Sequence, residues 1–264
     1  MTPPGTPPAR EAPRVGEHRR GSRVRTTEAG TWFPAVAPDE APAGLLLVHP
    51  GVDLRVLLPV LRTLAELALP GVLPTRAVLV EQAGRTWLVA DAPIVPAVSD
   101  ALVDGPHRDA GCAAAVLTDV GDTLLAAHRA GLVHGGVGAQ AVVLGPAGAA
   151  LLTDWGTLGH GAQASPADDA AGWADLAGLL AERWCPGSPD GAAELTAAGR
   201  AARAEGLDSG VDRLRATGAG APRATLAAVA AARIADPRSP LAAVPPAPAT
   251  PIGTSGPDTP SEPP

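Results

Sequence analysis

One stretch decides the fold: HRAGLVHGG at 128–136, followed by VVL at 142–144 and LTDWG at 152–156. Apolar residues at helical spacing extend back from it to Gly111, and Gly131 has the position of a helix-ending glycine. Two short apolar runs, 141–144 and 150–153, flank Gly-Pro-Ala-Gly, a pattern typical of a hairpin. The stretch therefore predicts a long helix, a loop, a hairpin and then a turn that carries Asp154.

Strands are predicted before this stretch and helices after it. Leu45–Val48 is an apolar run of buried-strand length, and 77–80 with 86–89 has the pattern of a second hairpin. Between them, 53–69 has helical spacing, and Asp53 is placed to cap it. Further helices are predicted at 169–184, 193–205 and 225–234. Strands gather early and helices late, which is typical of an α+β fold.

Composition separates a foldable middle from two ends. Of 264 residues, 31 are Gly and 30 are Pro, and the segments 1–21 and 236–264 combine many of these with few apolar side chains. Such segments cannot bury enough apolar surface to offset chain entropy, so we predict disorder for both. The foldable part divides into a strand-rich region, 22–92, and a helical region, 93–235. We expect a set of arginines near the N-terminus to be solvated, where they could touch an acidic partner: Arg19, Arg20, Arg23 and Arg25.

Charge and composition argue against several classes of function. A net charge of −7 argues against nonspecific nucleic-acid binding, which requires a basic surface. No apolar run approaches the roughly 20 residues that a membrane helix needs, so no membrane partner is expected. Cys112 and Cys185 are too few for a disulfide framework or a cysteine-rich metal site, and reduced thiols favour a cytoplasmic location. The sequence has no Lys, Asn or Tyr, which excludes chemistry that needs an ammonium, amide or phenol from those residues.

The order of motifs over 128–156 resembles the centre of a eukaryotic-like protein kinase, most closely the bacterial serine/threonine kinases. In that family a helix leads into a catalytic loop, H-R-D-L-x-x-x-N, and a hairpin then leads to D-F-G. His134 matches the first position of the loop, Asp154 matches the metal-binding aspartate, and Trp155 replaces the phenylalanine. The resemblance implies a protein-kinase-like two-lobed fold with a reduced strand-rich N-lobe and a truncated helical C-lobe.

Most groups that perform phosphoryl transfer in this family are missing. Gly136 stands where the family has its catalytic aspartate, and Ala141 stands where it has the asparagine that helps to hold Mg²⁺. The strand that should carry the phosphate-pairing lysine ends in His49. In the family, the next helix supplies a glutamate that pairs with this lysine. Here the expected position falls near Val60, and the nearest acidic residue, Glu66, lies too close to the end of the helix. Because phosphoryl transfer depends on positioning and charge stabilisation, the resemblance predicts a loss of catalysis.

Three further residues are candidates for roles at this site. Asp154 is a candidate ligand for a divalent cation, although one carboxylate holds Mg²⁺ weakly; the alternative is a turn aspartate that bonds backbone N–H groups. His134 is expected to bond the backbone near the loop. Asp169 resembles the aspartate that braces the catalytic loop in kinases, with Asp168 as its rival, and either residue could instead cap the following helix.

The sequence therefore predicts a catalytically inactive, kinase-like protein, a pseudokinase, that acts as a binding or scaffolding module for an unidentified protein partner. Neither ATP nor Mg²⁺ is expected as a cofactor. The alternative is a divergent Ser/Thr protein kinase or phosphotransferase that keeps residual ATP and Mg²⁺ binding through Asp154. A test of nucleotide binding distinguishes the two.

Overall fold

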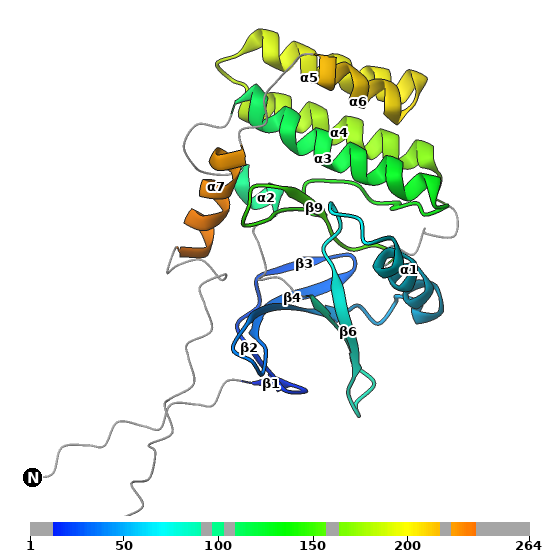
Figure 1. Ribbon diagram of the computed structural model, residues 1–264, viewed down its shortest axis with the longest axis vertical. Coiled ribbons are helices and arrows are strands. Elements are labelled where there is room, and N and C mark those ends of the chain that lie inside the picture. The colour runs from blue at the N-terminus through cyan, green and yellow to red at the C-terminus, as the bar shows by residue number, and fades with distance from the viewer. Residues whose placement is uncertain (1–12, 91–96, 103–108, 157–163, 217–222, 236–264) are drawn as a thin grey trace, which may run out of the picture.

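The computed structural model describes residues 13–90, 97–102, 109–156, 164–216 and 223–235 (Figure 1). They form an α+β fold, as predicted. Its strands are β1 (Arg14–Val15), β2 (His18–Arg20), β3 (Arg25–Thr27), β4 (Gly30–Val36), β5 (Pro42–Val48), β6 (Thr75–Val80), β7 (Thr86–Ala90), β8 (Val142–Leu144) and β9 (Ala150–Leu152). Its helices are α1 (Leu54–Leu67), α2 (Val98–Ala101), α3 (Ala110–Arg129), α4 (Pro166–Trp184), α5 (Pro189–Glu205), α6 (Leu207–Ala216) and α7 (Arg223–Ala235). Most of the predicted disorder, at 1–12 and 236–264, lies outside the described residues.

Seven of the strands form one curled antiparallel sheet. Its order is β1-β2-β4-β5-β7-β6, and β3 also pairs with β4. The β6–β7 pair is the hairpin predicted at 77–80 and 86–89. A Cβ built on Gly16, in the turn between β1 and β2, would lie 3.4 Å from Leu79 Cδ1 on β6. The two edges of the sheet therefore approach each other.

The first two strands correct the prediction of disorder over 1–21. Residues 14–20 form β1 and β2, which pair with each other and with β4. Val15 is only 2% exposed, and the Arg20 guanidinium lies 4.5 Å from the centroid of the Phe33 ring. The prediction failed there because each strand has only two or three residues. Its apolar partners come from distant parts of the sheet, which a local composition argument does not register.

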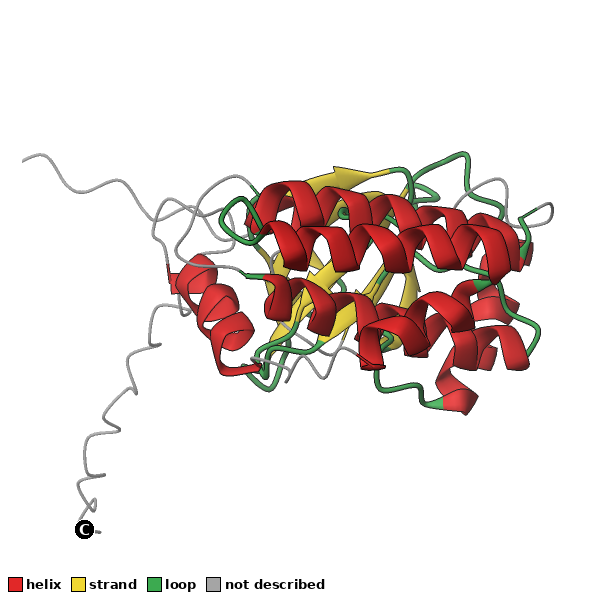
Figure 2. Cartoon of the chain, turned by 90° about the horizontal axis from the view of Figure 1, so that it is seen from above, coloured by secondary structure: helices red, strands yellow, loops and turns green. Residues whose placement is uncertain are grey.

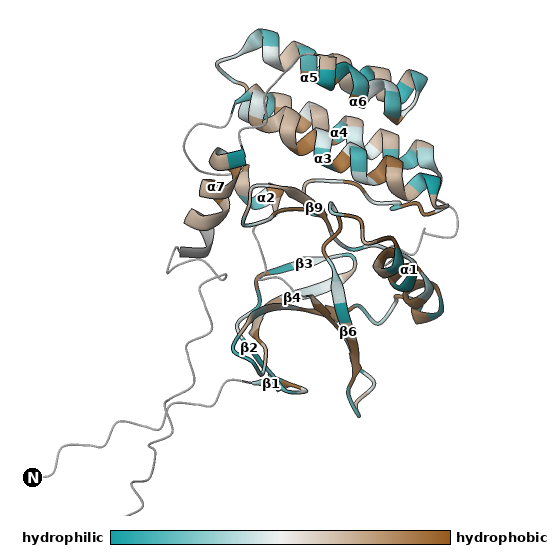
Figure 3. Ribbon diagram, in the orientation of Figure 1, coloured by the Kyte–Doolittle hydropathy of each residue, from teal (hydrophilic) through white to brown (hydrophobic). Residues whose placement is uncertain are grey.

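Helix α1 lies beside the sheet and begins where the sequence predicts. The Asp53 carboxylate caps it by accepting a hydrogen bond of 2.9 Å from the Arg55 N–H, as N-cap residues do. Its C-terminal end is marked by Ala68 in the left-handed conformation, with φ 47°. The buried residues of α1 are Leu57 and Leu64. Other apolar side chains of this helix stay partly exposed, and they colour much of it brown in Figure 3.

Helices α3, α4, α5 and α6 pack into a double layer, in which α5 and α6 lie over α3 and α4 (Figure 1). Figure 2 looks down on this double layer, with the strands behind it. Trp173 of α4 is fully buried, and its indole N–H donates a 2.8 Å hydrogen bond to the Leu117 carbonyl of α3. Gly121 lets α6 approach α3 closely, because a Cβ there would lie 2.3 Å from Val211 Cγ2. This layer holds an extensive apolar core, distinct from the two smaller apolar clusters of the sheet.

Two helix starts were predicted three or four residues late, and two helices, the short α2 and α6, were not predicted. Helix α4 begins at Pro166 rather than 169, and α5 begins at Pro189 rather than 193, since proline suits the first helical position. Helix α6 has a largely polar sequence and was missed. It buries one stripe at helical spacing: Leu207, Gly210, Val211 and Leu214.

Helix α7 is held to the rest of the fold by one arginine and an apolar face. Arg223 makes a bidentate ion pair with Asp119 of α3 and donates a 3.2 Å hydrogen bond to the Gly148 carbonyl. Asp119 also accepts a 2.8 Å hydrogen bond from the Ala150 N–H, and Leu226 is fully buried. Helix α7 therefore ties the β8–β9 hairpin to α3.

Helix α3 corrects the expectation about apolar segments. By length and composition alone it could cross a membrane. However, 61% of its most apolar window is buried inside the fold. A central core helix has the same properties, so α3 is weak evidence for a membrane protein.

Candidate functional site

Asp169, in the first turn of α4, holds the loop that follows α3. Its side chain is fully buried. Asp169 Oδ2 accepts a hydrogen bond of 2.9 Å from the His134 N–H and lies 2.8 Å from His128 Nε2, while Oδ1 accepts a bond of 2.7 Å from the Gly135 N–H. The N-cap of α4 is Ser165, and the neighbouring Asp168 completes a capping box, accepting bonds of 2.8 Å from the N–H and the hydroxyl of Ser165. The structure thus separates the two rivals: Asp169 braces the loop and Asp168 takes part in the cap of α4.

His134 joins the same loop to the end of β9. Its ring is 1% exposed, and Nε2 lies 2.8 Å from the Thr153 carbonyl oxygen. Nδ1 accepts a 3.2 Å hydrogen bond from the Gly136 N–H, which places the ring proton on Nε2. Burial lowers the pKa of His134, and the Thr153 carbonyl and the carboxylates of Asp169 and Asp154 oppose that shift only in part. A neutral imidazole with both ring nitrogens hydrogen-bonded fits the expected structural role.

Asp154 follows β9 with a left-handed backbone, φ 66°, which is uncommon for a residue other than glycine. Its Oδ1 accepts a 3.2 Å hydrogen bond from the indole N–H of Trp32 on β4. The Trp32 ring is 4% exposed. The indole N–H, the one polar group of the Trp32 side chain, therefore bonds Asp154, the predicted metal ligand.

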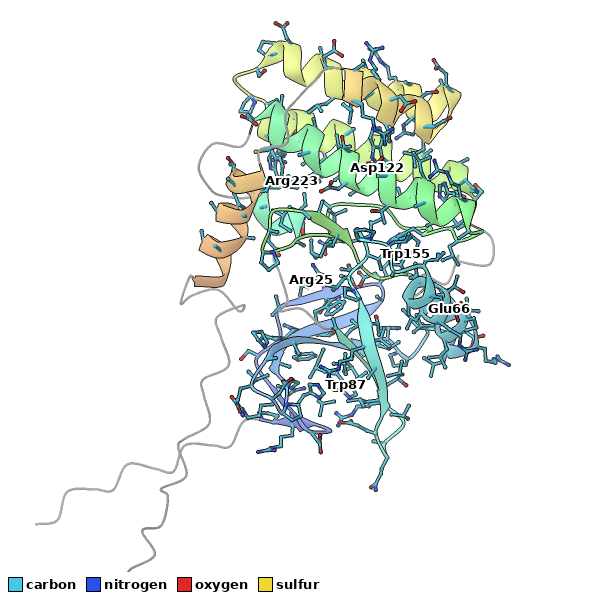
Figure 4. All side chains as sticks on the ribbon, in the orientation of Figure 1. Arg25, Glu66, Trp87, Asp122, Trp155 and Arg223 are labelled. Carbon is cyan, nitrogen blue, oxygen red and sulfur yellow. The ribbon has the colours of Figure 1, made fainter. Side chains whose placement is uncertain are left out.

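Arg25 is the residue of the site that sequence reasoning missed. It was expected to be solvated with its neighbours, yet its guanidinium stacks 5.4 Å from the Trp32 ring centroid, and Nη2 lies 3.4 Å from Thr153 Oγ1. Its Nε and Nη1 are buried without a hydrogen-bond partner among the described residues. Burial lowers the pKa of Arg25, and the carboxylates of Asp154 and Asp100 act in the opposite direction. Figure 4 shows Arg25 at the level where the sheet meets the β8–β9 hairpin.

The other predicted positions carry no reactive group toward Asp154. Gly136 offers only its backbone N–H, which bonds His134. Ala141 is buried, and its carbonyl accepts hydrogen bonds from the N–H and the hydroxyl of Thr153.

His49 lies just beyond the end of β5, at the position where the resemblance places the degenerate substitute for the lysine. It is exposed there, and its Nδ1 accepts a 3.1 Å hydrogen bond from the Gly51 N–H. The residue of β5 that lines the same cavity as Asp154 is Leu46, three positions earlier. Successive residues of a strand face opposite sides, which agrees with the absence of His49 from the cavity lining.

Helix α1 presents an apolar residue to the turn after Asp154. A Cβ built on Gly156, whose φ is +67°, would lie 3.2–3.3 Å from the side chain of Val60. Glu66, the nearest acid of the helix, is exposed. The expected partner glutamate therefore has no counterpart on this face of α1.

A cavity of about 420 Å³ lies between α1, the sheet and the turn at Asp154. Most residues that line it are apolar. They are Trp32, Leu46, Leu61, Leu64, Ala65, Ala68, Leu69, Pro70, Val72, Leu73, Pro74, Thr75, Leu88, Leu151, Thr153, Asp154 and Trp155.

These groups do not fit ATP with Mg²⁺. Mg²⁺ takes several oxygen ligands, but Asp154 Oδ1 already accepts the Trp32 N–H. Within the described ranges, no cluster of three or more His, Cys, Asp or Glu side chains could hold a metal ion. The cavity offers apolar walls where a phosphate chain needs cations and backbone N–H groups. Binding of an uncharged or weakly polar molecule suits this chemistry better than phosphoryl transfer.

Comparison with known proteins adds no assignment. Neither a scan against models of protein families nor a search of the curated proteins finds a match to this chain.

Proposed function

We propose that this chain is a pseudokinase: a kinase-like, catalytically inactive protein that binds or scaffolds a protein partner. The order of elements supports the proposal. A sheet with one helix comes first and a layer of helices follows (Figure 1). Asp154 lies between the two, since it follows β9 and accepts a hydrogen bond from Trp32 of β4. This arrangement suits a reduced N-lobe that begins with β1 at Arg14 rather than at residue 22, and a truncated C-lobe over 93–235.

The observation that carries the proposal is the hydrogen bond between Trp32 and Asp154. In an active kinase the corresponding carboxylate holds the metal ion that bridges the phosphates. Here the indole N–H of Trp32 lies 3.2 Å from Asp154 Oδ1, and the guanidinium of Arg25 stacks on the same indole. One oxygen of the carboxylate is thus already engaged by the chain's own indole N–H, and Gly136 has no side chain that could accept a proton.

The structural part of the kinase-like loop is retained. Buried polar groups are costly unless they are hydrogen-bonded. Asp169 has three partners and His134 has two. A loop that keeps its bracing but lacks its reactive groups favours a role in binding over a role in catalysis.

The proposal is tested by thermal unfolding of the full chain with ATP and either Mg²⁺ or Mn²⁺, beside the variants Trp32→Phe and Asp154→Ala. A ligand at one hundred times its Kd would add roughly 2.7 kcal/mol to stability. In a domain of this size that raises Tm by roughly 5–11 °C. We expect no shift for the wild-type chain. Trp32→Phe removes the competing N–H donor but keeps the ring, so a shift confined to this variant would identify Trp32 as the group that excludes the metal.

Phosphate transfer is the second arm of the test. Incorporation of radiolabelled phosphate into the chain itself or into a generic protein substrate should stay at background. Incorporation that Asp154→Ala abolishes would overturn the proposal and favour the divergent kinase.

A further inference from the structure

The cavity beside Asp154 has the character of a ligand site of its own. Its volume of about 420 Å³ lies within the range of roughly 300–1,000 Å³ that is usual for small-molecule pockets. Water gains little in an apolar space of this kind because it finds few polar partners there. We propose that the cavity binds a small, elongated apolar molecule that ends in a hydrogen-bond donor, as an alkanol or an alkylamine does.

One wall of the cavity is fixed by backbone hydrogen bonds. The Leu73 N–H donates to the Leu152 carbonyl at 3.0 Å, and the Leu152 N–H donates to the Gly71 carbonyl at 2.7 Å. Pro70 and Pro74 flank this segment and restrict its backbone further. The segment that lines the cavity at 69–75 is therefore held in place by β9 and cannot simply collapse inward.

The opposite wall is α1, which is anchored by its N-terminal cap and its buried leucines. Asp53 caps its N-terminus, and Leu57 and Leu64 are buried. Leu61 and Ala65 lie along the same helix, line the cavity and stay at least partly exposed. A helix with a strong apolar face normally buries that face. Here part of it faces a space that a ligand could fill.

The polar groups of the lining set the preference for the ligand's head group. Asp154 is the one charged residue among those lining the cavity in the described part of the chain. Thr75 adds a hydroxyl group that can accept a hydrogen bond, whereas the Thr153 hydroxyl already bonds Ala141 and Arg25. A carboxylate in the cavity should repel a second carboxylate and accept from a hydroxyl or an ammonium group. Arg25 interacts electrostatically with Asp154 and offsets part of this charge, but it is not among the residues that line the cavity. Discrimination against anions by the lining carboxylate is therefore the diagnostic property.

This inference does not rest on the proposed function. The cavity, its fixed wall and its carboxylate have the same chemistry whether or not the fold is related to kinases. The test with ATP and a metal ion and the test with apolar ligands can therefore give opposite results. Binding of either ligand without the other is a recognisable outcome.

The experiment compares hexyl and octyl chains that end in an alcohol, an amine or a carboxylate. Binding to the full chain is followed by titration calorimetry and by tryptophan fluorescence, because Trp32 and Trp155 line the cavity. Each added methylene should tighten binding about fourfold if the chain is buried. The alcohol and the amine should bind at least tenfold more tightly than the carboxylate of equal length.

Two variants locate the site. Ala65→Trp places a large ring in the cavity and should weaken octanol binding at least tenfold, whereas Leu58→Trp puts the same ring on an exposed part of α1 outside the cavity and should not. Asp154→Asn keeps the side-chain shape and should remove the discrimination against octanoate. This second variant remains informative if Ala65→Trp does not fold. Binding without chain-length dependence, equal effects of the two tryptophan variants, or an unchanged preference in Asp154→Asn would each overturn the proposal.

Discussion

Replacing Asp169 with alanine should unfold the loop after α3 more effectively than any exposed change on the same helix. The variant leaves the backbone N–H groups of His134 and Gly135 and the ring of His128 without their acceptor. Each buried donor left unsatisfied costs about 1–3 kcal/mol. Removal of a buried carboxylate also recovers part of its desolvation penalty. The expected net loss in the free energy of unfolding is about 3–4 kcal/mol.

The assay is urea unfolding, followed by circular dichroism and tryptophan fluorescence. Two aspartates on α4 serve as matched controls. Asp168→Ala removes an exposed cap, and Asp175→Ala removes the exposed partner of Arg203. Both should lower stability much less than Asp169→Ala, because solvent replaces the lost contacts. Asp169→Asn keeps the shape and one acceptor oxygen, so its stability should lie between that of Asp169→Ala and that of the wild type.

Equal unfolding midpoints for Asp169→Ala and Asp168→Ala, with unchanged m values, would mean that the buried bracing contributes nothing beyond the cap. A stability of Asp169→Asn equal to that of the wild type would mean that the second carboxylate oxygen and the charge are dispensable.

Two further predictions follow from the same structure. Burial lowers the pKa of His134 from its ordinary 6.5, so below pH 6.5 the unfolded state binds a proton that the folded state does not bind. The contribution of His134 to stability should be complete above that pH, and the free energy of unfolding should fall by up to about 1.4 kcal/mol per pH unit as the pH drops. In urea titrations at several pH values, His134→Gln should flatten this slope. Gly148→Ala should destabilise the attachment of α7, because its Cβ would lie 2.1 Å from the Arg223 carbonyl oxygen at a φ of +79°. Gly84→Ala is the control, since Gly84 has a similar φ of +74° but no atom within 4 Å of the added Cβ. Equal rates of hydrogen exchange in α7 of the two variants would contradict this prediction.

Elements with a strong local signal were predictable. The α1 helix, the β6–β7 and β8–β9 hairpins and the long helix α3 all stand where periodicity and turn residues place them. Such signals are local, since a cap, a Gly-Pro turn or a helical stripe acts within a few residues. The strands over 14–20 and helix α6 have weak local signals, and they form because distant parts of the chain supply their apolar partners.

The candidate site divides in the same way. The chain alone predicts His134 and Asp154 at one loop, because both lie in one motif-rich stretch, but it leaves the choice between Asp168 and Asp169 open. Folding adds the sheet residues: Trp32 bonds Asp154, Arg25 is buried beside it, and Leu46 rather than His49 lines the cavity. These contacts span more than one hundred positions of sequence. Only the curl of the sheet and the docking of the β8–β9 hairpin bring them together, and no periodicity within a strand contains that information.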